Sequence, residues 1–190
     1  SNIHSIIDNS SNIVQAFEDR KNYRRENSLV GGGITNEASS FIFTLPRDVG
    51  HPTAEQWEEM TKIILDQMHD DISRAIVRRN EKELADRDDP NKPNHKKNPI
   101  IPAISREDLE QHCVVVMHDE SSSPNKKSHI HMLVSNVMKN ERIKPVSQYA
   151  ATYGAKKGFN LAVERVLGIS NLEYTPKRKN SGDVPGWVKR

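Results

Sequence analysis

Residues 112–136, HCVVVMHDESSSPNKKSHIHMLVSN, contain two apolar runs joined by a polar loop. The first run, 112–118, is rich in β-branched residues and predicts a strand buried on both faces. The second run, 128–137, predicts another strand, and the polar residues between them suit a hairpin connection. We therefore expect an antiparallel strand pair here, and the rest of the fold must be arranged around it.

Three further elements are predicted before this hairpin. Residues 10–27 read as a short amphipathic helix, and 39–46 as a strand in which apolar side chains alternate. From Ala54 to about Leu84 apolar residues recur at helical spacing behind a capping box, which predicts an unusually long helix. Residues 86–99 are polar and contain three prolines, so they are expected to form a loop.

The segment after the hairpin is predicted to be mostly helical. It spans 143–168 and ends at Gly168, which suits a helix C-cap. Gly154 and Gly158 weaken its middle, so we expect a kink there. Residues 171–176 could add a short strand. Together the elements predict an α+β fold, an antiparallel sheet with helices packed on it.

The composition suits one domain with a modest core. The chain has 190 residues, 34% of them hydrophobic, and we expect a single domain over 1–175. Residues 176–190 read as a basic tail or a linker toward a missing downstream region. The single Cys113 cannot form an internal disulfide, which fits the cytoplasm. No apolar stretch approaches the roughly 18 residues that span a bilayer, so no membrane partner is expected.

Charge is distributed unevenly along the chain. Residues 139–190 hold eleven Lys or Arg and four Asp or Glu, a net +7, whereas the whole chain carries only +2. Such asymmetry favours a polyanionic partner for the C-terminal part, with nucleic acid first. The alternative is a solvated basic face without a partner.

Three histidines converge on the predicted hairpin. His129 and His131 share one face of their strand, and His118 lies beside them if the strands pair antiparallel. Three imidazoles at one point can bind a divalent metal with open coordination positions, as catalysis requires. A carboxylate of Asp119 or Glu120 could orient a ligand histidine, and Glu120 could instead ligate the ion. The alternative is a polar hairpin that binds no metal.

The segment 118–136 resembles the metal motif of conjugative and mobilisation relaxases in the HUH endonuclease superfamily. The residues that match that motif are His118, Asp119, His129, His131 and Asn136. The similarity extends over roughly 112–169. It implies an HUH-relaxase or Rep-like fold, with Asp119, Glu120 and Asn136 supporting the metal ligands.

The resemblance also implies an activity. Relaxases nick single-stranded DNA at a plasmid origin of transfer through a tyrosine, which remains joined to the 5′-phosphate. The implied cofactor is Mg²⁺ or Mn²⁺, although three imidazoles intrinsically suit Zn²⁺ or Ni²⁺ better. The implied setting is the bacterial cytoplasm, with accessory mobilisation proteins as further partners.

The nucleophile is assigned by its order in the chain. Relaxases carry the tyrosine ahead of the histidines, which favours Tyr23, flanked by Arg24 and Arg25. Tyr149 and Tyr153 instead resemble the Tyr-x-x-x-Tyr-x-x-Lys pattern of rolling-circle replication initiators, or they are aromatic residues that pack the helix.

Two more functions are compatible with the same residues. One is a DNA-binding module of the same fold that does not cleave, and the second is a metallohydrolase that uses water as its nucleophile. The basic residues expected to contact DNA phosphates are Arg24, Arg25, Lys126, Lys127, Lys156 and Lys157.

Overall fold

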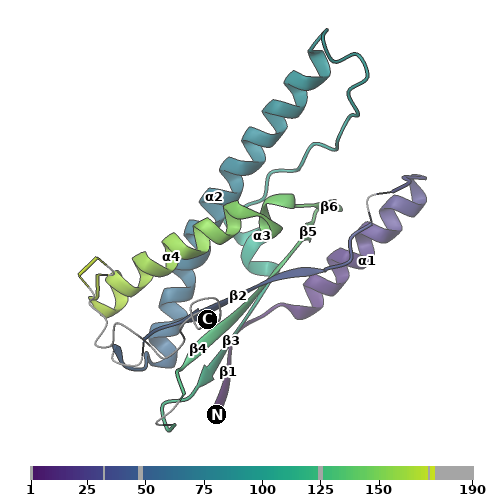
Figure 1. Cartoon of the computed structure of the whole chain (residues 1–190). Coiled ribbons are helices and arrows are strands. Elements are labelled where there is room, and N and C mark those ends of the chain that lie inside the picture. The colour runs from purple at the N-terminus through teal and green to yellow at the C-terminus, as the bar shows by residue number, and fades with distance from the viewer. Residues whose placement is uncertain (1, 32, 47–48, 124–125, 171, 174–190) are drawn as a thin grey trace, which may run out of the picture.

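The computed structural model describes residues 2–31, 33–46, 49–123, 126–170 and 172–173 (Figure 1). The predicted tail, 176–190, lies outside these residues. The predicted strand at 171–176 is described only at Leu172 and Glu173, which lie in a turn.

The fold is α+β, as predicted, and its main sheet has four antiparallel strands in the order β1-β3-β4-β2. These strands are β1 (Asn2–Asp8), β2 (Ala38–Thr44), β3 (Cys113–Asp119) and β4 (His129–Ser135). Two short strands, β5 (Val137–Met138) and β6 (Glu141–Arg142), form a separate hairpin directly after β4.

Helices lie mainly on one face of the sheet. They are α1 (Ser10–Glu26), α2 (Ala54–Asp88), α3 (Arg106–Gln111), the 3-10 turn η2 (Lys144–Ser147) and α4 (Tyr149–Leu167). Helices α2 and α4 pack together and cover the sheet, whereas α1 extends away from it (Figure 1). None of the described helices is both long enough and apolar enough to cross a membrane.

The two faces of the sheet differ sharply. Phe43, Val115 and Met132 point toward α2 and α4 and are buried in the core. On the opposite face, in the part of the chain that the structure describes, Ile42 remains 60% exposed and Leu133 39% exposed. The prediction that the first hairpin strand is buried on both faces was therefore wrong, because helices cover only one side. We call the other side the open face.

Glycines allow α4 to lie close against α2. A Cβ atom at Gly158 would come within 2.8 Å of the Cα of Ile64, and one at Gly154 within 2.9 Å of the Cα of Met68. The helix runs without a break to its C-cap at Gly168, which adopts φ +67°. Gly154 and Gly158 thus interrupt no part of α4, and both serve close packing against α2.

The outer part of α2 is paired with the polar loop that follows it. The helix has 35 residues, about 52 Å, and extends beyond the sheet (Figure 1). Glu83 is buried there and accepts hydrogen bonds from the backbone N–H of Asn98 at 2.8 Å and its side-chain Nδ2 at 2.9 Å. Arg87 and His95 also contact this carboxylate. Together with the Asn98 bonds, they hold the pKa of Glu83 at about 2.

Strand β1, helix α3 and the short β5–β6 hairpin are absent from the sequence-based prediction. Strand β1 is an exposed edge strand without one-sided alternation, so no pattern marks it. Helix α3 does carry a local signal, because Ser105 and Asp108 form a capping box at its start. The long helix also continues to Asp88, four residues beyond the predicted end.

Candidate metal centre

Strand pairing brings three histidines together on the open face. His118 on β3 lies directly opposite His129 on β4, and His131 lies opposite Val116. The three ring centroids are 4.9 Å apart in every pair. One coordinating nitrogen from each ring lies within 4.8 Å of the other two. The predicted convergence of these imidazoles is therefore confirmed.

Hydrogen bonding defines which nitrogen of His129 is available. Its Nδ1 lies 2.8 Å from the backbone carbonyl oxygen of Lys127, so Nδ1 carries the proton and donates. The lone pair then resides on Nε2, which is free to bind an ion. A backbone carbonyl thus fulfils the role that was expected of a carboxylate.

His131 is biased toward the neutral form that binds metals. Burial lowers the pKa of its imidazole, and the positive charges that His129 and His118 can carry lower it further. A metal ligand must be deprotonated at the coordinating nitrogen, so this environment favours coordination.

The donor set suits a single divalent ion. Nitrogen ligands bind at about 2.0–2.1 Å, which places two of them at most about 4 Å apart, so the rings would close slightly on binding. Among the described residues, this group consists of three half-buried histidines and no carboxylate. Three neutral ligands on an uncovered face would leave coordination positions open to a substrate.

Asp119 and Glu120 organise the hairpin loop instead of the histidines. Oδ1 of Asp119 accepts from the backbone N–H of Ser121 at 2.9 Å, and this bond lowers the pKa of the carboxyl. Glu120 is buried, and its Oε1 lies 3.7 Å from Nζ of Lys126. The prediction that Asp119 supports the ligands is corrected, because Asp119 follows His118 directly and so faces the other side of the strand. Glu120 is outside the group of described residues that could hold an ion, and its support of the ligands stays a prediction.

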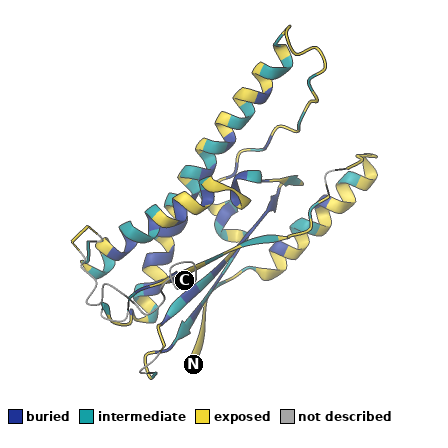
Figure 2. Cartoon of the chain, in the orientation of Figure 1, coloured by how far each residue is buried: buried dark blue, intermediate teal, exposed yellow. Residues whose placement is uncertain are grey.

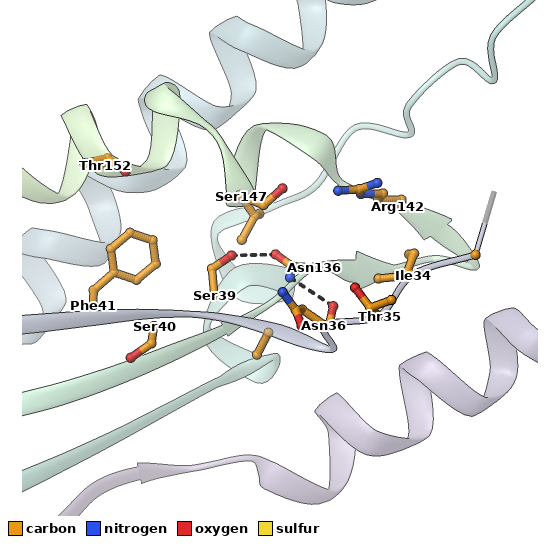
Figure 3. A pocket seen from close by; sticks show the side chains of 13 residues that line it. Ile34, Thr35, Asn36, Ser39, Ser40, Phe41, Asn136, Arg142, Ser147 and Thr152 are labelled. Carbon is orange, nitrogen blue, oxygen red and sulfur yellow. Dashed lines mark hydrogen bonds between the residues drawn. The ribbon is translucent and has the colours of Figure 1, made fainter.

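His129 is the first residue of β4, and Asn136 lies just beyond the other end of that strand. Its Oδ1 accepts from Oγ of Ser39 at 2.7 Å, and its Nδ2 donates to the carbonyl of Asn36 at 3.1 Å (Figure 3). The prediction that Asn136 supports the metal ligands is corrected in the same way. Its amide connects β4 to the segment that enters β2.

Tyr23 lies in the last turns of α1, away from the histidines. Strand β1 begins beside them, with Ile3 opposite His118, and ends with Asp8 opposite Val114. Helix α1 starts at that far end and extends away from the β3–β4 loop (Figure 1). The structure therefore does not bring Tyr23 to the histidines in this conformation.

Tyr149 and Tyr153 lie on the other side of the sheet from the histidines. They occupy α4, which packs on the face opposite the open face (Figure 1). Their rings are stacked with centroids 5.4 Å apart, and Tyr149 is 76% exposed. These two tyrosines are therefore neither core residues nor neighbours of the metal ligands.

Two of the predicted DNA-contacting lysines lie near the centre. Lys126 and Lys127 are exposed in the loop that leads into β4, next to His129. Lys126 faces the carboxylate of Glu120 across 3.7 Å, so its charge is partly compensated.

The other predicted basic residues lie elsewhere. Arg24 donates to backbone carbonyls after α1, and Arg25 donates to a side chain of the same helix. Lys157 pairs with Asp71 at 3.5 Å, and Lys156 is exposed on α4. Arg24 and Arg25 thus have local structural partners, and both lysines lie on the helix-covered side.

A second polar site was missed by the sequence-based prediction. An open pocket of about 450 Å³ lies between β2 and the η2–α4 segment (Figure 3). Ser39, Asn136, Arg142 and Ser147 contribute to its lining. Ser39 is 97 residues away from Asn136 in the sequence, so no local pattern predicts the pocket.

Comparison of the chain with protein-family models, with curated proteins and with solved structures finds no match. Function must therefore be inferred from the residues and their geometry.

Proposed function

We propose that this chain is a metal-dependent DNA strand transferase of the relaxase type. It would nick single-stranded DNA at a plasmid origin of transfer and form a 5′-phosphotyrosine intermediate. The observation that carries the proposal is the gathering of His118, His129 and His131 on the open face of an antiparallel sheet. The resemblance of 118–136 to the relaxase metal motif supplies the reaction class.

The site suits chemistry on a phosphodiester. A divalent ion held by three neutral imidazoles would keep most of its charge and stabilise the negative charge that develops on a scissile phosphate. In this proposal Lys126 and Lys127, which are exposed in the loop next to His129, would pair with flanking phosphates. The open face leaves room for a DNA strand to approach the three rings.

In the proposed step a tyrosine attacks the phosphorus atom. Its phenolic oxygen forms the new bond as its proton leaves, and the bond from phosphorus to the 3′ oxygen breaks. That oxygen takes up a proton and departs as a 3′ hydroxyl, while the 5′-phosphate stays on the tyrosine. The resemblance assigns this role to Tyr23.

Attack by Tyr23 requires α1 to reorient about its junction with β1. The helix is exposed along most of its length (Figure 2), and its described buried residues are Ile13 and Arg20. Such a limited attachment favours movement of the helix over the open face when DNA binds.

The test is a denaturing gel of protein mixed with a pool of single-stranded DNA and Mn²⁺. The DNA is labelled at its 3′ end, because the fragment joined to tyrosine retains that end. Wild type is compared with Tyr23→Phe, Tyr149→Phe, Tyr153→Phe and His131→Ala. The matched control is His4→Ala, an exposed histidine on β1 outside the cluster.

We expect a shifted covalent band that disappears in His131→Ala and Tyr23→Phe and persists in His4→Ala. Loss of the band in Tyr149→Phe or Tyr153→Phe alone would replace the proposal with a replication initiator. If no protein forms a band although metal and DNA bind, the chain is a DNA-binding module that does not cleave or a hydrolase that uses water.

A further inference from the structure

The pocket between β2 and the η2–α4 segment is lined by polar groups. Its volume of about 450 Å³ lies within the range typical of small-ligand sites. The side chains that supply hydroxyl, amide and guanidinium groups include Thr35, Ser39, Asn136, Arg142, Ser147 and Thr152 (Figure 3). This set offers hydrogen-bond donors and acceptors and one positive charge.

The charge of the pocket is suited to an anion. Arg142 is the one charged residue among its described lining, which contains no carboxylate. In the described part of the chain, the guanidinium of Arg142 has no hydrogen-bond or ion-pair partner, so its donors are available. Burial lowers the pKa of Lys144, and the charges of Arg79 and Arg142 lower it further while the Glu83 carboxylate raises it, so Lys144 and Arg79 add positive charge nearby and Glu83 offsets part of it.

The floor of the pocket is held in place before any ligand arrives. The side-chain amide of Asn136 is bonded at both ends, to Ser39 and to the carbonyl of Asn36 (Figure 3). Its backbone carbonyl accepts from Ile143 at 2.9 Å, which ties the floor to the segment carrying Arg142. Binding therefore does not require these groups to become ordered first.

Two exposed aromatic side chains, Tyr149 and Tyr153, are neighbours in sequence of residues that line the pocket. Ser147 and Thr152 line it, and Tyr149 lies between them in the chain. The rings of Tyr149 and Tyr153 are stacked at 5.4 Å, and Nζ of Lys157, which also pairs with Asp71, lies 5.1 Å from the ring of Tyr153. Exposed aromatic rings next to cations are the usual means of binding single-stranded nucleic acid, because every base can stack.

We propose that this pocket binds one nucleotide of a single DNA strand, with Arg142 pairing with its phosphate. Tyr149 and Tyr153 stack on the neighbouring bases. The choice of DNA rests on the proposed function, which this inference deepens by adding a second contact region.

The pocket and the metal centre hold different parts of the strand. The pocket extends from Asn136, just beyond the end of β4, along β2 to Phe41, which pairs with Met132, and the histidines lie toward the other end of β4. The pocket also lies on the helix-covered side, whereas the histidines are on the open face. A bound strand would pass the free edge of β2 between the two regions.

The test measures binding without cleavage. Protein in EDTA is titrated into fluorescein-labelled oligothymidine of about 12 nucleotides, and anisotropy is followed over a series of salt concentrations. The variants are Arg142→Gln and Tyr149→Ala. The matched controls are Arg78→Gln, an exposed arginine on α2, and Tyr149→Phe, which keeps the ring.

Each variant has a distinct expected signature. Arg142→Gln should weaken binding about tenfold at low salt and reduce the slope of log K against log salt by about 0.7, the value for one phosphate contact on a single strand. Tyr149→Ala should weaken binding at least about fivefold without changing that slope, because stacking releases no counterions. Both controls should stay within about twofold of wild type.

Unchanged affinity and slope in Arg142→Gln would overturn the assignment of the pocket. If oligouridine binds more tightly than oligothymidine, and if that binding depends on Arg142, the ligand of the pocket is RNA and not DNA. Because the assay needs no metal and no nicking, an inactive protein whose binding depends on Arg142 refutes only the proposed function. A nicking enzyme that binds DNA independently of Arg142 refutes only the pocket.

Discussion

A single hydrogen bond gives His129 its chemical role. The carbonyl of Lys127 accepts from Nδ1, which orients the ring and leaves Nε2 for an ion. Strand pairing alone places the other two ligands. His118 lies opposite His129, and His131 lies two residues further along β4 on the same face. The candidate metal centre thus depends on the register of β3 against β4.

The metal centre can be tested one ligand at a time. We expect His118→Ala, His129→Ala and His131→Ala each to weaken the binding of Zn²⁺ and Mn²⁺ by more than about tenfold, because each removes one of three donors. Zn²⁺ should bind more tightly than Mn²⁺ to imidazole ligands. Isothermal titration calorimetry measures this, with His4→Ala as control. Wild-type affinity in any of the three variants would remove that residue from the site.

Glu83 predicts a pH-dependent contribution to stability. Hydrogen bonds from Asn98, then Arg87, lower its pKa from 4.5 to about 2. Because the folded pKa is depressed, the stabilisation is present above pH 4.5 and is lost as the pH falls toward 2. Glu83→Gln should therefore be less stable than wild type at pH 7, and the difference should shrink between pH 5 and pH 3. Urea denaturation at each pH measures it, and a constant difference would contradict this role of the Glu83 carboxylate.

Among the secondary-structure elements, those with local signals were predicted best. The start of α2 follows from the Thr53–Gln56 capping box, and the end of α4 from Gly168. Strand β1 has no such signal; it pairs with β3 at the edge of the sheet and is mostly exposed. The partner of Asn136 is likewise invisible in the sequence, because Ser39 is 97 residues away.

Strand alternation could have corrected one prediction about the site. Neighbouring residues of a strand face opposite sides, so Asp119 could not share a face with His118. The position of His118 on the same face as His129 and His131 was predictable for the same reason. What alternation cannot supply is the position of α1, and with it the position of Tyr23, because that depends on how the helix leaves β1.

The α2–α4 contact predicts an unusual effect of added side-chain volume. Alanine normally stabilises a helix by about 1 kcal/mol relative to glycine. At Gly158 its Cβ would lie 2.8 Å from the Cα of Ile64, and overpacking of this kind costs about 1–3 kcal/mol. We expect Gly158→Ala to lose about 1–2 kcal/mol of unfolding free energy in urea denaturation. Glu164→Ala, exposed on the same helix, should be nearly neutral, and a stabilised Gly158→Ala would refute the close contact.

Across the whole molecule, the layered fold separates the candidate metal centre from the polar pocket. Helices α2 and α4 cover one face of the sheet and leave the histidines uncovered on the other (Figure 1). The polar pocket lies at the far end of β4, where α4 begins. Charge asymmetry along the chain predicted an anionic partner, and Arg142 and Lys144 belong to that basic part, whereas Arg79 on α2 joins them only through folding.

The metal centre should also stabilise the whole sheet, and Cys113 can report it. This cysteine is fully buried on β3, the strand that carries His118, and burial raises the pKa of its thiol to about 12. A thiol reagent therefore reacts only when the sheet opens. An ion that binds only the folded state slows opening, so Mn²⁺ at about 100 times its Kd should slow labelling of Cys113 by about 100-fold. His131→Ala should show no such protection. If Mn²⁺ does not change the labelling rate of the wild-type protein, no ion links β3 to β4.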